Sequence, residues 1–166
     1  GGRKDRGAAI GGTMAFAYSA LVCEVEVDPD TAEIHIEKIW VAQDVGKALN
    51  PLMIEGQMHG GAVQGLGFAL HERMVYDDDG QLISASFLDY DLPKAHQVPT
   101  IEAVIVETPS PEGALGVRGV GEPPIIPGAA AVGNAIRDAT GVRINELPMR
   151  PEVVWRAIEK FHGTHP

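Results

Sequence analysis

The sequence predicts an α+β fold in which mixed strands pack against helices. Apolar and polar residues alternate in two neighbouring segments near the N-terminus, whereas apolar residues recur every four positions in a later segment. The 166 residues, 45% hydrophobic and 22% charged, are typical of one globular domain. Neither an internal repeat nor a linker divides the chain, so we treat residues 1–166 as one unit.

The first two elements are predicted to form a β-hairpin. Residues 21–28 (LVCEVEVD) and 33–42 (EIHIEKIWVA) have strand-like patterns, and the intervening Pro29-Asp30-Thr31 is typical of a turn. The single cysteine, Cys23, excludes an internal disulfide and lies on the apolar side of the first strand. We therefore expect Cys23 to be a buried small hydrophobic residue and not a nucleophile.

The uncharged run from Gly7 to Cys23 follows three basic residues and has the outline of a signal peptide. Its glycines and polar residues dilute the hydrophobicity, and it is shorter than the ~20 apolar residues of a spanning helix. It also continues directly into strand-like alternation. We therefore expect neither a signal peptide nor a membrane span here.

Residues 57–74 predict a helix, because Met58, Ala62, Leu66, Leu70 and Met74 are spaced by four. Four glycines interrupt this helix, and each costs about 1 kcal/mol relative to alanine. They stand at positions 60, 61, 65 and 67. Close packing within the protein and a bulky ligand on this face explain the glycines equally well at this point.

The remaining elements are predicted from turn residues, alternation and helix signals. Residues 77–80 (DDDG) form a turn, 83–90 and 100–108 are strands, and 113–124 form a loop. A helix over 129–139 is closed by Gly141, and Pro151 begins a final helix.

Composition excludes several functions. A net charge of −10 without a basic stripe disfavours nucleic acid as a partner. The six histidines are scattered and show no zinc-like spacing, and His59 and His71 are too far apart on one helix to share a metal. No complete nucleotide-binding glycine motif or nucleophile elbow is present.

Glu122 is the carboxylate that stands out, within Val120-Gly121-Glu122-Pro123-Pro124. The following proline restricts its backbone, and Gly121 permits another molecule to approach. If buried, this carboxylate would suit a general base working near neutral pH. The alternative is a surface residue that caps the following helix, and local sequence alone favours this alternative. A hydrolase pairing Glu122 with Asp89 or Asp91 is a weaker third hypothesis.

Three ordered blocks resemble the molybdenum hydroxylases, the xanthine dehydrogenase and aldehyde oxidase family. They are AQDVGKALNPLMIEGQMHGGAVQGLGFALHE (42–72), SFLDYDLPKAHQVPTIEAVIVE (86–107) and GVGEPPIIPGAAAVGNAIRDATGVR (119–143). The resemblance covers most of the chain. It implies that residues 1–166 are the C-terminal part of the large molybdopterin-binding subunit, as a fragment or a split subunit.

The resemblance also implies roles for individual residues. Glu122 stands at the position of the family's catalytic base, and Gln57 stands where the family contacts the molybdopterin cofactor. Gly60, Gly61 and Gly121 are then expected beside the cofactor. Molybdenum itself is held by the pterin dithiolene, so no protein ligand to the metal is expected. His59 occupies a position where many relatives carry glutamate, which leaves the subfamily open.

The implied activity is hydroxylation of an aldehyde or N-heterocycle carbon with water as the oxygen source, performed only together with the rest of the large subunit. The cofactor is molybdopterin with molybdenum, for which the cytosine dinucleotide form is one alternative. Iron–sulfur clusters and FAD are expected on other domains or subunits, and the location is cytoplasmic, with the periplasm as the alternative. A competing hypothesis is a non-catalytic assembly module of the same fold that binds partner subunits without a cofactor.

Overall fold

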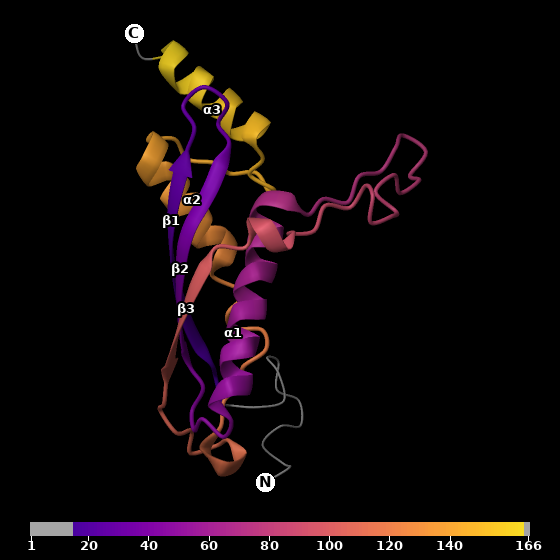
Figure 1. Cartoon of the computed structure of the whole chain (residues 1–166). Helices are drawn as coiled ribbons and strands as arrows, with labels where there is room; N and C mark the ends of the chain where they lie inside the picture. Colours follow the sequence, from indigo (N-terminus) through magenta and orange to yellow (C-terminus); the bar gives the residue numbers. More distant parts are fainter. Residues whose placement is uncertain (1–14, 165–166) are drawn as a thin grey trace.

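The computed structural model describes residues 15–164, which include a three-stranded sheet in the order β1-β2-β3 (Figure 1). Strands β1 (Tyr18–Val27) and β2 (Ile34–Asp44) pair antiparallel, and β3 (Thr100–Val106) pairs parallel with β2. This confirms the predicted hairpin, the strand predicted over 100–108 and the α+β class. Residues 7–14 of the run with the outline of a signal peptide lie outside the described residues, and the end of that run is part of β1.

The turn of the hairpin is held by Asp28. Its carboxylate accepts hydrogen bonds from the backbone N–H groups of Asp30 (2.9 Å) and Thr31 (2.8 Å). These two bonds hold the pKa of Asp28 below its usual value. Short polar side chains that bond to the backbone just ahead are a standard way to start a turn, so this local sequence favours the hairpin.

Helix α1 (Pro51–Leu66) begins six residues earlier than the sequence pattern predicted. Asn50 caps it by accepting a hydrogen bond from Met53 N at 3.2 Å, and Pro51 occupies the first helical position. A π-helical turn (Gly67–His71) ends the helical segment. The buried stripe of Met58, Ala62 and Leu66 is confirmed, but Met74 lies beyond the helix and is 59% exposed.

Helices α2 (Gly128–Thr140) and α3 (Pro151–Thr164) confirm the two predicted C-terminal helices. Gly141 closes α2 in the left-handed conformation (φ 77°), as its position in the sequence predicted. Among residues 15–164, no helix combines the length and the apolar character needed to cross a bilayer.

The hydrophobic core lies between one face of the sheet and helices α1 and α2. Ile39 of β2 joins Ala62 and Leu66 of α1 and Val132 and Ile136 of α2 in one buried cluster. Ala32, Ile36 and Val154 extend the same cluster to the hairpin turn and α3, so α3 closes the turn end of the sheet (Figure 1).

Cys23 belongs to the inner face of β1 and packs against this cluster. Burial raises the pKa of its thiol to about 11. The thiol is therefore protonated at neutral pH, which confirms its interpretation as a small hydrophobic residue and not a nucleophile.

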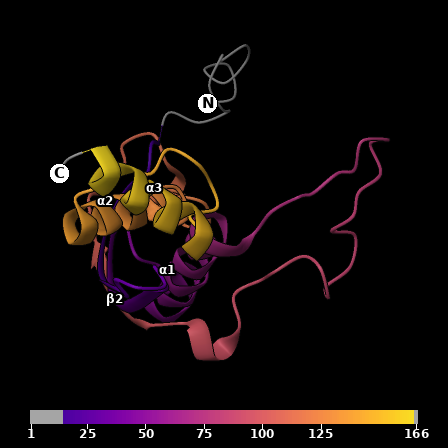
Figure 2. The ribbon, with the colours of Figure 1, turned by 90° about the horizontal axis from the view of Figure 1, so that it is seen from above.

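Residues 73–92 form an arm that reaches away from the body of the protein (Figures 1 and 2). The predicted turn at residues 77–80 is confirmed, with Gly80 at φ 79°. The strand predicted over 83–90 is wrong, because this segment is a series of bends and turns. Phe87 and Leu88 are 87% and 97% exposed, so no neighbouring strand in the described chain is available to pair with them.

Candidate functional site

The loop that carries Glu122 lies across helix α1 at the positions that the sequence had singled out. Pro124 packs on α1, since a methyl group at Gly61 would lie only 2.5 Å from Pro124 Cγ. Gly121 neighbours Gln57, because a Cβ atom built on Gly121 would lie 3.6 Å from Gln57 Oε1. The fold therefore brings Gln57, Gly61, Gly121 and Glu122 together although they are about 60 residues apart in sequence.

Side chains of the first two strands hold this loop. Gln43 Nε2 of β2 donates to the carbonyl oxygens of Gly119 (3.0 Å) and Val120 (3.4 Å). Ser19 Oγ of β1 donates to the carbonyl oxygen of Pro123. Within the loop, Ile125 N donates to Glu122 O at 3.0 Å, which closes a turn around the glutamate. The backbone of Glu122 is thus fixed on both sides.

An ion pair anchors the start of the loop. Arg118 Nε lies 3.3 Å from Asp44 Oδ2, and the guanidinium also donates to Phe16 O (2.6 Å) and Thr108 O (3.0 Å). Asp44 Oδ1 in turn accepts from Gly46 N and Thr108 N, both at 3.0 Å. Burial would raise the pKa of Asp44, but these N–H groups and Arg118 outweigh burial and hold it below its usual value.

The Glu122 side chain is exposed among the described residues. The burial that a tuned general base requires is therefore not supplied by this chain's own described residues. The competing interpretation, a cap for the next helix, is not realised either. The cap position of α2 is Pro127, and no side chain hydrogen-bonds there.

The four glycines of the α1 segment differ in what surrounds them. A methyl group at Gly65 would lie 2.9 Å from the backbone oxygen of Ile125, and one at Gly67 would meet the carboxylate of Glu72, a flexible side chain that can move away. Packing within the chain therefore requires glycine at Gly65 and, against Pro124, at Gly61. A methyl group at Gly60 would meet no atom within 4 Å, so this position faces open space. Packing within the protein thus explains Gly61 and Gly65, and Gly60 leaves room for another molecule.

A hollow of about 250 Å³ adjoins Gln57. Val45, Ile54 and Val120 form apolar walls, while Lys47 and Arg118 contribute positive charge. His59, two residues after Gln57 and next to Gly60, lies 4.0 Å from Glu55 Oε1 through its Nε2 atom. Across residues 15–164, no group of three or more His, Cys, Asp or Glu side chains is arranged to hold a metal ion.

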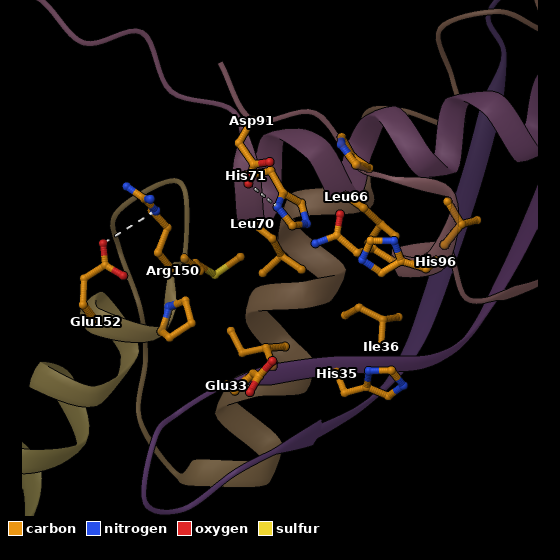
Figure 3. Close-up of a pocket in the computed structure, with 16 residues that line it drawn as sticks. Glu33, His35, Ile36, Leu66, Leu70, His71, Asp91, His96, Arg150 and Glu152 are labelled. Carbon is orange, nitrogen blue, oxygen red and sulfur yellow. Dashed lines mark hydrogen bonds and ion pairs between the residues drawn. The ribbon is translucent and has the colours of Figure 1, made fainter. Parts of the chain in front are cut away.

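A larger hollow, of about 440 Å³, opens at the other end of α1 (Figure 3). Here His71 Nδ1 and Asp91 Oδ2 are 3.0 Å apart, and Arg150 pairs with Glu152 at 3.6 Å. Burial opposes ionisation of Asp91, but His71 and Lys94 outweigh it and hold the Asp91 pKa below its usual value. Ten helical residues, about 15 Å, separate His71 from Gly61, so the structure does not join Asp91 to Glu122. Asp89 bonds to Ser86 in the arm instead.

Comparison with known proteins identifies the family. The family model described as the molybdopterin cofactor-binding domain matches residues 3–99. The chain belongs to the molybdopterin cofactor-binding domain family. The resemblance to the molybdenum hydroxylases that the sequence blocks indicated is therefore confirmed.

Individual relatives of this molybdopterin-binding chain are similar over most of its length. A putative xanthine dehydrogenase molybdenum-binding subunit of Escherichia coli (strain K12) is 42% identical over 88% of this chain. The nicotine 6-hydroxylase large subunit of Paenarthrobacter nicotinovorans is 45% identical over 80%. The chain spans 19% and 17% of these two relatives, respectively.

Solved structures agree with the fold. Quinoline 2-oxidoreductase from Pseudomonas putida 86 superposes with a TM-score of 0.77 at 37% identity, over 82% of this chain and 18% of that one. Aldehyde oxidoreductase from Desulfovibrio gigas gives a TM-score of 0.78 at 37% identity, over 86% and 15%.

The described residues fit a molybdopterin cofactor at the surface around Gln57. Cβ atoms at Gly56, Gly60 or Gly119 would meet no atom of residues 15–164 within 4 Å, so in the described part of the chain bare backbone is open on the helix and on the loop. A flat, polar ring system can approach such backbone closely, and the Gln57 carboxamide beside it both donates and accepts hydrogen bonds.

Sequence reasoning missed the residues that support this surface. Ser19, Gln43, Asp44 and Arg118 drew no attention, because their roles depend on which strands and loops meet. One signal was present at Gln43. The predicted second strand ended at Ala42, and extending its alternation by one residue places a glutamine on the face that carries Ile39 and Val41. A polar side chain at a buried position of a strand indicates a specific hydrogen-bonding role.

Proposed function

We propose that residues 1–166 are the C-terminal part of the molybdenum-binding subunit of a molybdenum hydroxylase. The complete enzyme hydroxylates a carbon of an aldehyde or an N-heterocycle, with water as the source of oxygen. One observation carries this proposal: the loop with Glu122 lies against α1 beside Gln57, with open glycine backbone at Gly60 and Gly119 among the described residues. A proton acceptor and a cofactor-binding surface are thereby adjacent on one face.

In this proposal, Gln57 binds the cofactor through its carboxamide, and Gly60, Gly61 and Gly121 border it. When bound, the cofactor supplies the redox centre that accepts electrons from the substrate. Glu122 is the catalytic base, whose carboxylate takes the proton from the oxygen nucleophile. Its fixed backbone aims the carboxylate, and the rest of the subunit covers the exposed side chain and excludes water.

The complete enzyme holds its other redox groups elsewhere. We assign iron–sulfur clusters and FAD to other domains or subunits, and we propose a cytoplasmic location. Several relatives carry the names of subunits or large chains, which supports a multi-subunit assembly. The cytosine dinucleotide form of molybdopterin is one alternative within this proposal, and the rest of the subunit would then hold most of its phosphates and base.

The deciding experiment is metal analysis and visible absorption of the complex that contains this chain, purified from its native host. We expect about one molybdenum per copy, released together with a pterin on denaturation. A complex without molybdenum or pterin would instead support the alternative of a non-catalytic assembly module. As a control, the 166-residue chain expressed alone is expected to retain no molybdenum, since it forms only one wall of the pocket.

A further inference from the structure

Two residues that face each other across the hairpin hold the loop of Glu122. In the antiparallel register of β1 and β2, Ser19 is directly opposite Gln43. Directly opposite residues of an antiparallel pair project from the same face of the sheet, with Cβ atoms about 5 Å apart. Both side chains are therefore presented to the same neighbouring segment.

The two side chains form hydrogen bonds to the backbone of that segment before and after Glu122. Gln43 Nε2 donates to the carbonyl oxygens of residues 119 and 120, which precede the glutamate. Ser19 Oγ donates to the carbonyl oxygen of Pro123, which follows it. Neither side chain contacts the glutamate itself, so both act through the backbone.

Within the described chain, only the Nε2 end of the Gln43 carboxamide is hydrogen-bonded. The residue is fully buried, and its Oε1 atom has no hydrogen-bond partner among residues 15–164. Exchanging the positions of Oε1 and Nε2 would point an oxygen at two carbonyl oxygens, so the donor must face the loop. A buried acceptor without a partner costs stability, whereas a hydrocarbon of similar size would not. What glutamine contributes at this position is therefore the pair of hydrogen bonds that Nε2 donates to the loop.

We infer that Ser19 and Gln43 are a pair of positioning residues that fix the backbone at Glu122 for proton transfer. This inference rests on the proposed function, which makes Glu122 the base. The pair's task is to keep the loop in one conformation, so that the carboxylate does not have to be ordered during each turnover.

The test uses Gln43→Leu and Ser19→Ala in the complete, cofactor-loaded protein, with Ser19→Thr as the conservative variant. Ile39→Val is the matched control, because Ile39 is buried on the same face of β2 and its hydrophobic cluster contains no residue of the loop that carries Glu122. The first measurement is hydrogen exchange at the Ile125 amide, which reports the turn closed by Glu122 O. The others are the unfolding midpoint, molybdenum content, kcat and KM.

For Gln43→Leu we expect exchange at Ile125 to become about 3- to 10-fold faster, because the variant loses the ordinary hydrogen bond to Gly119 O and the longer one to Val120 O. We expect kcat to fall by a similar factor, with KM, molybdenum content and the unfolding midpoint unchanged. Ser19→Ala should behave likewise, and Ser19→Thr should restore both values. Ile39→Val should lower the unfolding midpoint and leave exchange at Ile125 and kcat unchanged.

Unchanged exchange at Ile125 in Gln43→Leu would overturn the inference, as would faster exchange with an unchanged kcat. A lowered unfolding midpoint, matching that of Ile39→Val, would also overturn it by showing a general structural role. Failure of the proposed function is distinguishable, because it appears in the parent protein as an absence of molybdenum and turnover. The exchange measurement does not depend on either.

Discussion

Ser19 and Gln43 are opposite each other on β1 and β2, and their hydrogen bonds reach the backbone before and after Glu122. The hairpin at the start of the chain thus fixes a loop about 100 residues later. Changes in the first strand can therefore alter the reactive surface without touching it. Four further predictions follow from contacts of this kind.

Glu122→Gln should remove the base while keeping the size of the side chain. In the complete enzyme we expect turnover to fall about 100- to 10,000-fold, the usual contribution of general-base catalysis, with molybdenum content unchanged. Steady-state kinetics and metal analysis measure the two effects. Glu26→Gln, on the exposed face of β1, is the control and should retain full turnover. Near-normal turnover of Glu122→Gln would refute the assignment.

Gly60→Val and Gly61→Val should separate cofactor contact from packing. A side chain at Gly61 collides with Pro124, so Gly61→Val should lower the free energy of unfolding by about 1–3 kcal/mol, as overpacking does. Gly60→Val meets open space in this chain and should leave stability of the cofactor-free protein nearly unchanged. It should nevertheless lower cofactor occupancy. Full occupancy in Gly60→Val would place the cofactor away from this turn of α1.

Asp44 should make stability depend on pH in the acid range. Because its pKa is lowered in the folded protein, the ionised form stabilises the fold above the ordinary carboxyl pKa of about 4. This contribution is lost as the pH falls through the folded-state pKa. Asp44→Asn should cost about 1–3 kcal/mol at neutral pH, and the difference from the parent should shrink below about pH 4. Unfolding midpoints from pH 3 to 7 measure it, with the exposed Asp78→Asn as control. A difference that is constant with pH would contradict the prediction.

The arm should drive self-association when the chain is separated from the rest of its subunit. Phe87 and Leu88 present large apolar side chains almost fully to solvent, and such surfaces associate in water. The double variant Phe87→Ser, Leu88→Ser should shift the isolated chain towards the monomer in light scattering after gel filtration. Ala85→Ser, a small change in the same arm, should not. Equal association of all three proteins would assign the effect to another surface.

Most of the fold was predictable because hydrophobic periodicity reports burial on one face. The strands near residues 21–28 and 100–108 and the two C-terminal helices were predicted for this reason. The strand predicted over 83–90 was wrong because an apolar, alternating segment forms a strand only where a partner strand can pair with it. Within residues 15–164, no strand lies beside the arm. The early start of α1 was readable from Asn50-Pro51, a cap followed by a first-turn proline.

The candidate site was predictable only in part. The sequence blocks singled out Gln57 and Glu122, and the structure shows that their segments meet. Which glycines of the α1 segment are packed and which are open could not be predicted from the sequence. The difference depends on Pro124 and Ile125, which cross α1 from a loop distant in sequence. The roles of Gln43 and Arg118 were not predicted for the same reason. Strand register and the path of a loop are properties of the whole fold and not of any local sequence pattern.

Gly65 of α1 and Gly128 of α2 touch backbone to backbone: a methyl group at Gly128 would lie 2.8 Å from Gly65 Cα, and one at Gly65 would lie 3.2 Å from Gly128 Cα. Enlarging either residue forces the helices apart, and because each contact faces backbone, no second substitution can make room. Descendants of this sequence can therefore vary the arm or the outer face of the sheet one residue at a time. At this helix crossing, however, no single substitution of either glycine is tolerated. We therefore expect both glycines to persist wherever the two helices keep their present separation.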